Sequence, residues 1–304
     1  MQLNRERWKG ILLVLLGASL WGSSSNVAQF LFQHDISPTW LVEVRLLVSG
    51  IGLLLYSIYR YGWKATCSIW TRWEDGKSIF LFSIGGMLSV QLTFFLAIKY
   101  GNAATATLLQ YLAPVLILIY SSIRNFKLPK SVDGFSILFA LLGITLLVTD
   151  GDVGQIAISP MALFWGLLSA VALAFYTLQP VSLLEKFASP IVVGWGMMIG
   201  AIIFSCLQSP WEFAWTLFKD RDLLFGLVFV ILFGTLLAFT FFLTSLRYIF
   251  PYEASVLSCI EPLTAVLIGV LFMNLSFMLW DWLGSLLIIL SVILISWKKE
   301  SQAS

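Results

Sequence analysis

Long apolar runs alternate with short polar links along the chain. The runs lie at 10–32, 38–59, 78–98, 102–123, 132–149, 160–181, 190–208, 223–246, 252–274 and 277–297. Each approaches or exceeds the roughly 20 residues that an α-helix needs to cross a bilayer. The links carry turn formers and charges, and none is long enough to fold as a soluble domain. The pattern predicts an all-α integral membrane protein with ten transmembrane helices.

Composition supports this class and excludes others. Of the 304 residues, 59% are hydrophobic and only 11% are charged, and the mean hydropathy is +0.92. A soluble domain has about 25% charged residues, so this chain lacks the polar residues that would cover a surface in water. The net charge of +2 gives no basis for a nucleic-acid partner.

Residues that commonly bind metals or cofactors are few and scattered. Cys67, Cys206 and Cys259 are far apart and His34 is the only histidine, so no metal-ligand spacing is present. The chain also has no G-x-x-x-x-G-K-[ST] segment, which would bind nucleotide phosphates. We expect no cofactor and no metal. The expected partners are a small-molecule substrate and membrane lipids.

Lysine and arginine are distributed unequally between the two sides of the predicted membrane domain. With the N-terminus inside, fourteen of the 18 basic residues are cytoplasmic: Arg5, Arg7, Lys9, Arg60, Lys64, Arg72, Lys77, Arg124, Lys127, Lys130, Lys186, Arg247, Lys298 and Lys299. Cytoplasmic loops are enriched in such residues. We therefore expect a multi-pass protein of the plasma membrane with both termini in the cytoplasm.

The two halves of the chain resemble each other weakly but in order. ATATLLQYLAPVLILI (104–119) aligns with YEASVLSCIEPLTAVL (252–267) at an offset of 148, which places Pro114 on Pro262. Chance similarity among leucine-rich helices is the alternative. As a repeat, the pattern predicts a five-helix half at 1–150 and a second at 151–304, together one membrane domain. Because five is odd, the halves are inverted relative to each other, which is a transporter architecture.

The two aligned prolines predict interrupted helices. Each proline removes a backbone donor and frees the carbonyl four residues earlier, that of Gln110 in one helix and of Ser258 in the other. At membrane depth such carbonyls are tolerated where they face protein or a watery cavity. We therefore expect Pro114 and Pro262 to mark helix breaks that border a central site.

Polar and aromatic side chains within the spans supply the candidate substrate-binding residues. They are Trp21, Ser24, Ser89, Gln91, Thr93, Gln110, Tyr176, Gln179, Ser258 and Glu261. Helix packing is the alternative role for the small and hydroxylated members, and packing or an interfacial position is the alternative for Trp21 and Tyr176.

Charged residues inside the spans are the most informative. A carboxylate near the bilayer centre costs about 2.5–3.5 kcal/mol, so Glu261 must face the protein interior. It either binds substrate or a proton, or forms a structural hydrogen bond; its repeat counterpart is Ala113. Glu43 and Arg45, two residues apart, do not share a helix face. Arg45 either binds an anionic substrate group, pairs with a neighbour or snorkels, and the structural roles are favoured.

These motifs together resemble the EamA-type transporters of the drug/metabolite transporter superfamily. The resemblance rests on SLWGSSSNVAQ, Arg45, LLQYLAPVL, SVLSCIEPLTAVL and DWLGSLLIILSVILI. It implies a central cavity lined by the first, third, fourth, sixth, eighth and ninth helices, and export of small metabolites, amino acids or toxic compounds. One departure is FMNLSF, where Asn274 stands in place of an expected acid, so the family's glutamate there is not carried over.

The sequence thus predicts a secondary transporter, not an enzyme. It is expected to move a small organic metabolite, such as an exported amino acid, across the plasma membrane by alternating access. Transport of a lipid or lipid-linked substrate is an alternative, as is a receptor or assembly subunit. An intramembrane enzyme would need acids or histidines clustered at one depth. A proton is the candidate coupling ion, and the oligomeric state stays open.

Overall fold

The structure is a computed structural model that describes residues 2–124, 131–152, 157–207, 220–245, 248–249, 254 and 257–303. All regular structure within these residues is helical. Up to residue 150 the elements are α1 (Gln2–Gln33), α2 (Pro38–Tyr61), α3 (Trp63–Cys67), η1 (Ser68–Trp70), α4 (Trp73–Leu81), the π-helix η2 (Phe82–Leu88), α5 (Ser89–Tyr100), α6 (Ala103–Gln110), α7 (Ala113–Arg124) and α8 (Ser131–Thr149).

The remaining elements follow the same order of long and interrupted helices. They are α9 (Pro160–Leu178), α10 (Val181–Leu184), α11 (Ser189–Leu207), α12 (Arg221–Ile231), the π-helix η4 (Leu232–Leu237), α13 (Ala238–Ser245), α15 (Ile260–Phe272) and α16 (Leu279–Ala303).

Most of the apolar runs form helices of membrane-spanning length. Among the described residues, seven helices are long and apolar enough to cross a bilayer. The predicted runs 132–149, 252–274 and 277–297 overlap shorter apolar helices at Gly134–Thr149, Ile260–Phe272 and Leu279–Leu294. Four of the basic residues used to predict orientation lie outside the described residues: Lys127, Lys130, Lys219 and Arg247.

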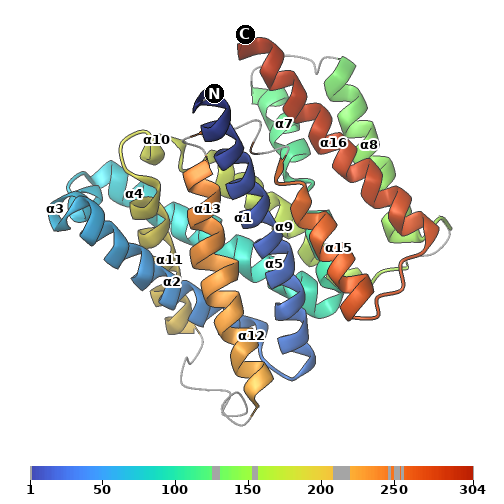
Figure 1. The fold of residues 1–304 in the computed structure, drawn as a ribbon, viewed down its shortest axis with the longest axis horizontal. Helices are drawn as coiled ribbons and strands as arrows, with labels where there is room; N and C mark the ends of the chain where they lie inside the picture. The colour runs from blue at the N-terminus through green and yellow to red at the C-terminus, as the bar shows by residue number, and fades with distance from the viewer. Residues whose placement is uncertain are drawn as a thin grey trace.

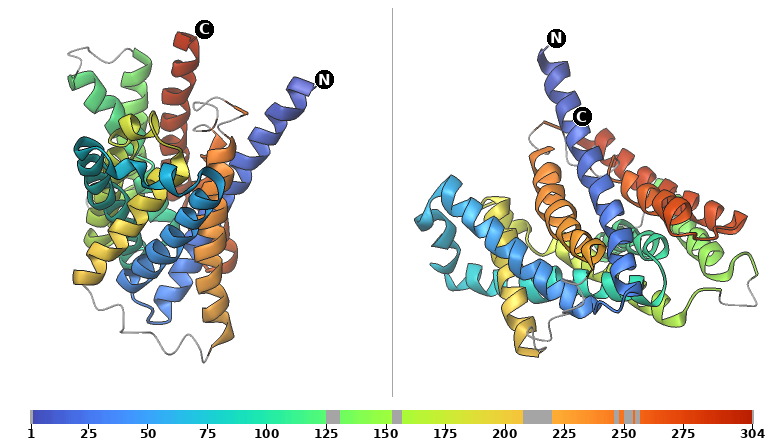
Figure 2. Two further views of the ribbon diagram at one scale, coloured as in Figure 1. Left: turned by 90° about the vertical axis from the view of Figure 1, so that its left-hand side faces the viewer. Right: turned by 60° about the horizontal axis from the view of Figure 1, so that its bottom comes forward.

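Helices from the two ends of the sequence pack side by side. α8 pairs with α16 at one edge of the molecule and α2 pairs with α11 at the other, with α1, α13 and α15 between them (Figure 1). α5 packs on α9 and α1 packs on α13, while α6 contacts both α9 and α15. Each of these pairs joins one helix before residue 150 to one after it. The two termini lie on the same side of the molecule (Figure 2).

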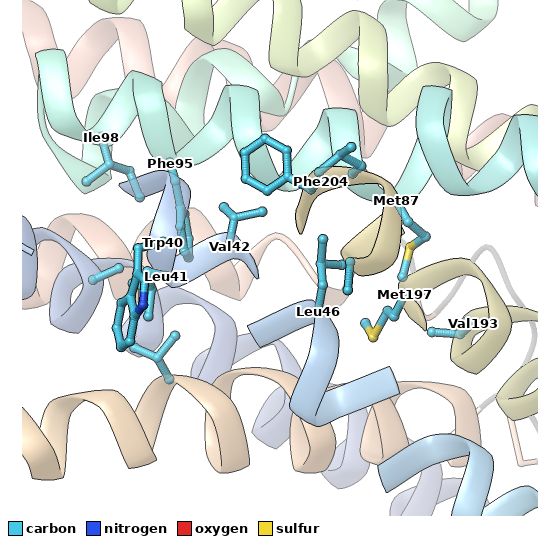
Figure 3. Close-up of a cluster of buried hydrophobic side chains, with 14 of the residues drawn as sticks. Trp40, Leu41, Val42, Leu46, Met87, Phe95, Ile98, Val193, Met197 and Phe204 are labelled. Carbon is cyan, nitrogen blue, oxygen red and sulfur yellow. The ribbon is translucent and has the colours of Figure 1, made fainter. Parts of the chain in front are cut away.

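A large apolar core forms between α2, α5 and α11. Leu46 of α2 and Met87 of η2 are almost fully buried in it, with Phe95 of α5 and Met197 of α11 (Figure 3). A second cluster lies between α6, α8, α9 and α16. Because lipid is as apolar as these side chains, close packing rather than exclusion from water must hold such helices together.

Asn274 has a structural reason for its place at the end of α15. Its φ is +51°, a left-handed conformation that asparagine tolerates better than most residues. The amides of Met273 and Leu275 both donate to the carbonyl of Gly269 at 3.1 Å. Asn274 therefore belongs to the turn that closes this helix.

The pairing of α8 with α16 depends on two facing glycines. A Cβ placed on Gly143 would lie 2.7 Å from the carbonyl oxygen of Gly284, and one on Gly284 would lie 2.8 Å from that of Gly143. Small residues let membrane helices approach this closely. Any side chain at either position would force the helices apart.

We expect Gly143→Ala to lower the free energy of unfolding by about 1–3 kcal/mol, the usual cost of overpacking a tight contact. Thermal unfolding in lipid nanodiscs measures this. Gly134→Ala in the same helix is the control, because a Cβ there meets nothing within 4 Å. Equal stability of the two variants would contradict the role of the glycine contact.

Candidate functional site

Two helices are interrupted immediately before a proline. α6 ends at Gln110 and α7 begins at Ala113, one residue before Pro114; α15 begins at Ile260, two residues before Pro262. Both prolines therefore lie in the first turn of a new helix, where their missing N–H costs no hydrogen bond. Two-residue turns at 111–112 and 258–259 separate the helical segments.

The two interruptions meet across the molecule. The hydroxyl oxygen of Tyr111 lies 2.7 Å from the carbonyl oxygen of Ser258 and 3.1 Å from Oε2 of Glu261. Pro262 cannot donate to this carbonyl as residue i+4 of a helix normally does; the carbonyl accepts instead from the Glu261 amide at 2.9 Å and from the Tyr111 hydroxyl. Tyr111, Ser258 and Glu261 thus form a polar cluster between α6 and α15.

This cluster holds more acceptors than donors when Glu261 is ionised. The Tyr111 hydroxyl has a single hydrogen, so the Ser258 carbonyl and the carboxylate compete for it. When Glu261 is protonated, its O–H can donate to the Tyr111 oxygen while Tyr111 donates to Ser258. Only the protonated form makes both hydrogen bonds at once.

Arg45 is another charged residue inside the spans, and it is buried, with 8% of its surface exposed. Its Nε donates to Oγ1 of Thr235 at 2.6 Å, its Nη2 lies 3.4 Å from the carbonyl oxygen of Gly234, and its guanidinium lies over the ring of Phe95 at 5.2 Å. The charges of Arg45 and Glu261 attract each other. No direct ion pair joins them among the described residues.

Both π-helices carry a hydroxyl that bonds a carbonyl five residues back. Ser89, at the end of η2, donates to the carbonyl of Ile84 at 2.7 Å, and Thr235, within η4, donates to that of Val230 at 3.1 Å. A π-turn leaves carbonyls without their usual helical partner, and such turns are frequent at functional sites. No pattern in the sequence predicted either turn.

The remaining candidates on α5 and α6 are also buried. Thr93 donates to the carbonyl of Ser89 at 2.7 Å, so its hydroxyl is satisfied within α5. Gln110 donates from Nε2 to Oγ of Ser169 at 2.6 Å and joins α6 to α9. Gln91 is 7% exposed, and neither of its amide atoms has a hydrogen-bond partner in the described chain.

The two candidate residues on α1, Trp21 and Ser24, contact α13 and η4. Trp21 lies against the rings of Phe239 and Phe242, at centroid distances of 5.1 and 5.3 Å. Ser24 is packed so closely on Gly234 that a Cβ there would overlap its hydroxyl. These contacts favour a packing role for Trp21 and place Ser24 next to the Arg45 contacts on η4.

Tyr176 and Gln179 are directed towards α4 and η2. The ring of Tyr176 stacks on that of Phe82 at 5.4 Å. Gln179 donates from Nε2 to the carbonyl and the hydroxyl of Ser78, at 2.9 and 3.0 Å. Within the described part of the chain these two residues therefore contact Phe82 and Ser78 rather than the Tyr111–Glu261 cluster.

Sequence reasoning missed three polar partners. Tyr111 lies within LLQYLAPVL, next to the predicted helix break, so its position could have identified it as a site residue. Asn26 donates to the carbonyls of Gly22 and Ala265, at 3.1 and 3.0 Å, and joins α1 to α15. Glu43 is 1% exposed and its Oε1 lies 2.5 Å from the Ser205 hydroxyl of α11.

We expect Tyr111→Phe to lower the free energy of unfolding by about 1–3 kcal/mol, because the Ser258 carbonyl and the Glu261 carboxyl group both lose their hydrogen-bond partner on Tyr111. Thermal unfolding in nanodiscs measures the loss. Tyr59→Phe is the matched control, since Tyr59 is 89% exposed. A Tyr111→Phe protein as stable as the control would show that the hydroxyl does not support the interruption.

Comparison with known proteins gives the family. The sequence model of the EamA-like transporter family matches residues 8–149 and again 160–297. A Salmonella typhimurium (strain LT2) protein named "Uncharacterized inner membrane transporter YicL" is 39% identical over 298 residues, 97% of each chain. A Bacillus subtilis (strain 168) protein named "Uncharacterized transporter YwfM" is 27% identical over 292 residues, 94% of this chain and 93% of its own.

A solved crystal structure shares the fold. It superposes with a TM-score of 0.59 over 97% of this chain and 99% of its own, at 16% sequence identity. The two matches to one family model account for most of the residues, and the Salmonella relative spans nearly the whole chain. The chain therefore belongs to the EamA-like transporter family and is a membrane-embedded transporter.

Proposed function

We propose that this transporter moves a small organic metabolite, an amino acid or related compound, out of the cell by alternating access. The observation that carries the proposal is the contact of Tyr111 with Ser258 and Glu261, which joins two interrupted helices at their breaks. Interrupted helices that meet near the midplane are where transporters bind substrate.

A ten-helix arrangement of two inverted five-helix repeats, 1–150 and 151–304, is part of this proposal. One family model matches each half separately. The helix pairs are also reciprocal: if the halves are exchanged, α5–α9 becomes α13–α1 and α7–α9 becomes α15–α1, and all four pairs are in contact. Reciprocal pairing is expected of repeats related by a two-fold axis.

The proposed orientation places both termini in the cytoplasm. The unequal distribution of basic residues supports it, and the two termini lie on one side of the fold (Figure 2). A C-terminal fluorescent-protein fusion is expected to be bright and an alkaline phosphatase fusion inactive, because the first folds only inside and the second only outside. The opposite pattern would reverse the orientation.

Proton coupling through Glu261 follows from the donor count of its cluster. Loss of the proton favours donation of the one Tyr111 hydrogen to the carboxylate rather than to the Ser258 carbonyl, so the contact between α6 and α15 changes when Glu261 ionises. The charge of Arg45 also acts on Glu261. A substrate that changes either interaction would therefore change proton binding, and the reverse.

The test is a flux screen in proteoliposomes with amino acids and related metabolites, with and without a pH gradient. Glu261→Gln is expected to fold at normal levels, to reduce flux about tenfold or more, as losing a hydrogen bond to a charged group would, and to flatten its pH dependence. Glu74→Gln, on the exposed start of α4, is the control. Normal flux with an unchanged pH response would remove Glu261 from the mechanism, and flux of lipids alone would favour a lipid substrate.

A further inference from the structure

Arg45 is a buried cation with no carboxylate partner among the described residues. Glu43 is close to Arg45 in sequence but contacts Ser205. Glu261, whose charge acts on Arg45, contacts Tyr111. Its neutral acceptors are Thr235 and the distant carbonyl of Gly234. Buried charges are normally paired. Nη1 is not engaged by any described residue, so the guanidinium retains capacity for an anion.

Gln91 is a second buried polar side chain with capacity to bind. It lies one helical turn before Phe95, so both project from the same face of α5. The guanidinium of Arg45 covers the ring of Phe95. Both amide atoms of Gln91 lack a partner and only 7% of the residue is exposed. A buried amide without a hydrogen-bond partner is destabilising, so a role other than stability explains why it is there.

The same face of α5 continues to a pocket. One turn beyond Phe95 lies Lys99, whose amine is 3.5 Å from the Phe32 carbonyl. Lys99 and Phe32 line a pocket at the C-terminal ends of α1 and α5, together with Gln29, Gln33, Ile98 and Gly101. The rings of Phe32 and Phe95 meet edge-on at 5.4 Å between this pocket and Arg45. A positive charge thus lines a pocket that is separated from the guanidinium by these two packed rings.

We infer that Arg45 and Gln91 form a subsite for the carboxylate of the transported solute, beside the ring of Phe95. A guanidinium offers parallel N–H groups that match the two oxygens of a carboxylate, and the Gln91 amide adds a neutral donor. Glu261 attracts this guanidinium without contacting it directly, so the N–H groups stay available, and a single cation fits a monocarboxylate better than a phosphate dianion. The subsite rests on the proposed transport function and names the chemical class of its substrate.

Thr235 is the positioning residue of this subsite. It accepts from Nε of Arg45 and donates its own hydrogen to the Val230 carbonyl of the π-turn. The hydroxyl is thus fixed on both sides and orients the guanidinium. Because α2 and η4 come from opposite halves of the sequence, the subsite is complete only when these halves are in contact.

Binding is tested on purified protein in lipid nanodiscs, with each acid compared with its neutral amide: propionate with propionamide, benzoate with benzamide and alanine with alaninamide. At least one acid is expected to raise the melting temperature, and its amide to have little effect. Gln91→Leu is expected to weaken binding of that acid about tenfold, the loss of one good hydrogen bond. Arg45→Gln is expected to abolish it.

Gln91→Leu also separates a binding role from a structural one. It removes an unsatisfied amide at nearly constant volume, so the unliganded protein is expected to melt no lower than the wild type. Ser57→Ala, whose hydroxyl bonds only the Leu53 carbonyl of its own helix, is the control and is expected to bind as the wild type does. Unlike Arg45→Gln, neither change breaks a contact between helices.

Three results would overturn the subsite: no acid raises the melting temperature, the amides act as strongly as the acids, or Gln91→Leu binds normally. These results are independent of transport. Acid-selective binding without flux for any solute would instead contradict the proposed transport function and leave the subsite intact. Flux that does not distinguish acids from amides would contradict the subsite alone.

Discussion

The structure depends on one constraint: a backbone polar group in lipid must find its partner within the protein. A continuous helix meets this requirement by itself, but this chain interrupts its helices repeatedly. At three of the four interruptions a hydroxyl donates to a backbone carbonyl. Tyr111 donates to the Ser258 carbonyl, Thr235 to that of Val230 and Ser89 to that of Ile84. The irregular backbone is therefore confined to the interior, where the polar side chains that satisfy it also gather.

The charged residues inside the spans also find their partners within the protein. Each is hydrogen-bonded to a residue from the other half of the sequence. Glu43 of α2 contacts Ser205 of α11, Arg45 contacts η4, and Glu261 of α15 contacts Tyr111. Glu43 and Arg45 are neighbours in sequence but bind different helices, as their spacing requires. The polar interactions thus join the two halves, together with apolar packing and, between α8 and α16, close glycine contacts.

Sequence alone predicted the helical membrane class, because hydropathy reports directly on the solvent that each run meets. It also indicated Pro114, Pro262 and Glu261, whose physical cost in lipid makes them conspicuous. It did not predict η2 or η4, since a π-turn has no distinctive composition. Nor did it predict that Arg45 meets Thr235, 190 residues later. Such pairs depend on how distant helices pack, and an aligned repeat locates the helices but not their side-chain partners.

The two π-helices are supported unequally. α2 is tied to η4 by charged hydrogen bonds from Arg45, whereas α11 packs on η2 through apolar side chains that include Met197 and Met87, with Gly196 against the ring of Phe82. Dispersion contacts weaken gradually as surfaces slide, but a hydrogen bond from a buried charge is lost abruptly. If the two halves exchange roles during transport, as proposed, the two facing states would therefore differ in free energy. Such a transporter would rest preferentially in one facing state, and the contact of Arg45 with η4 would determine which one.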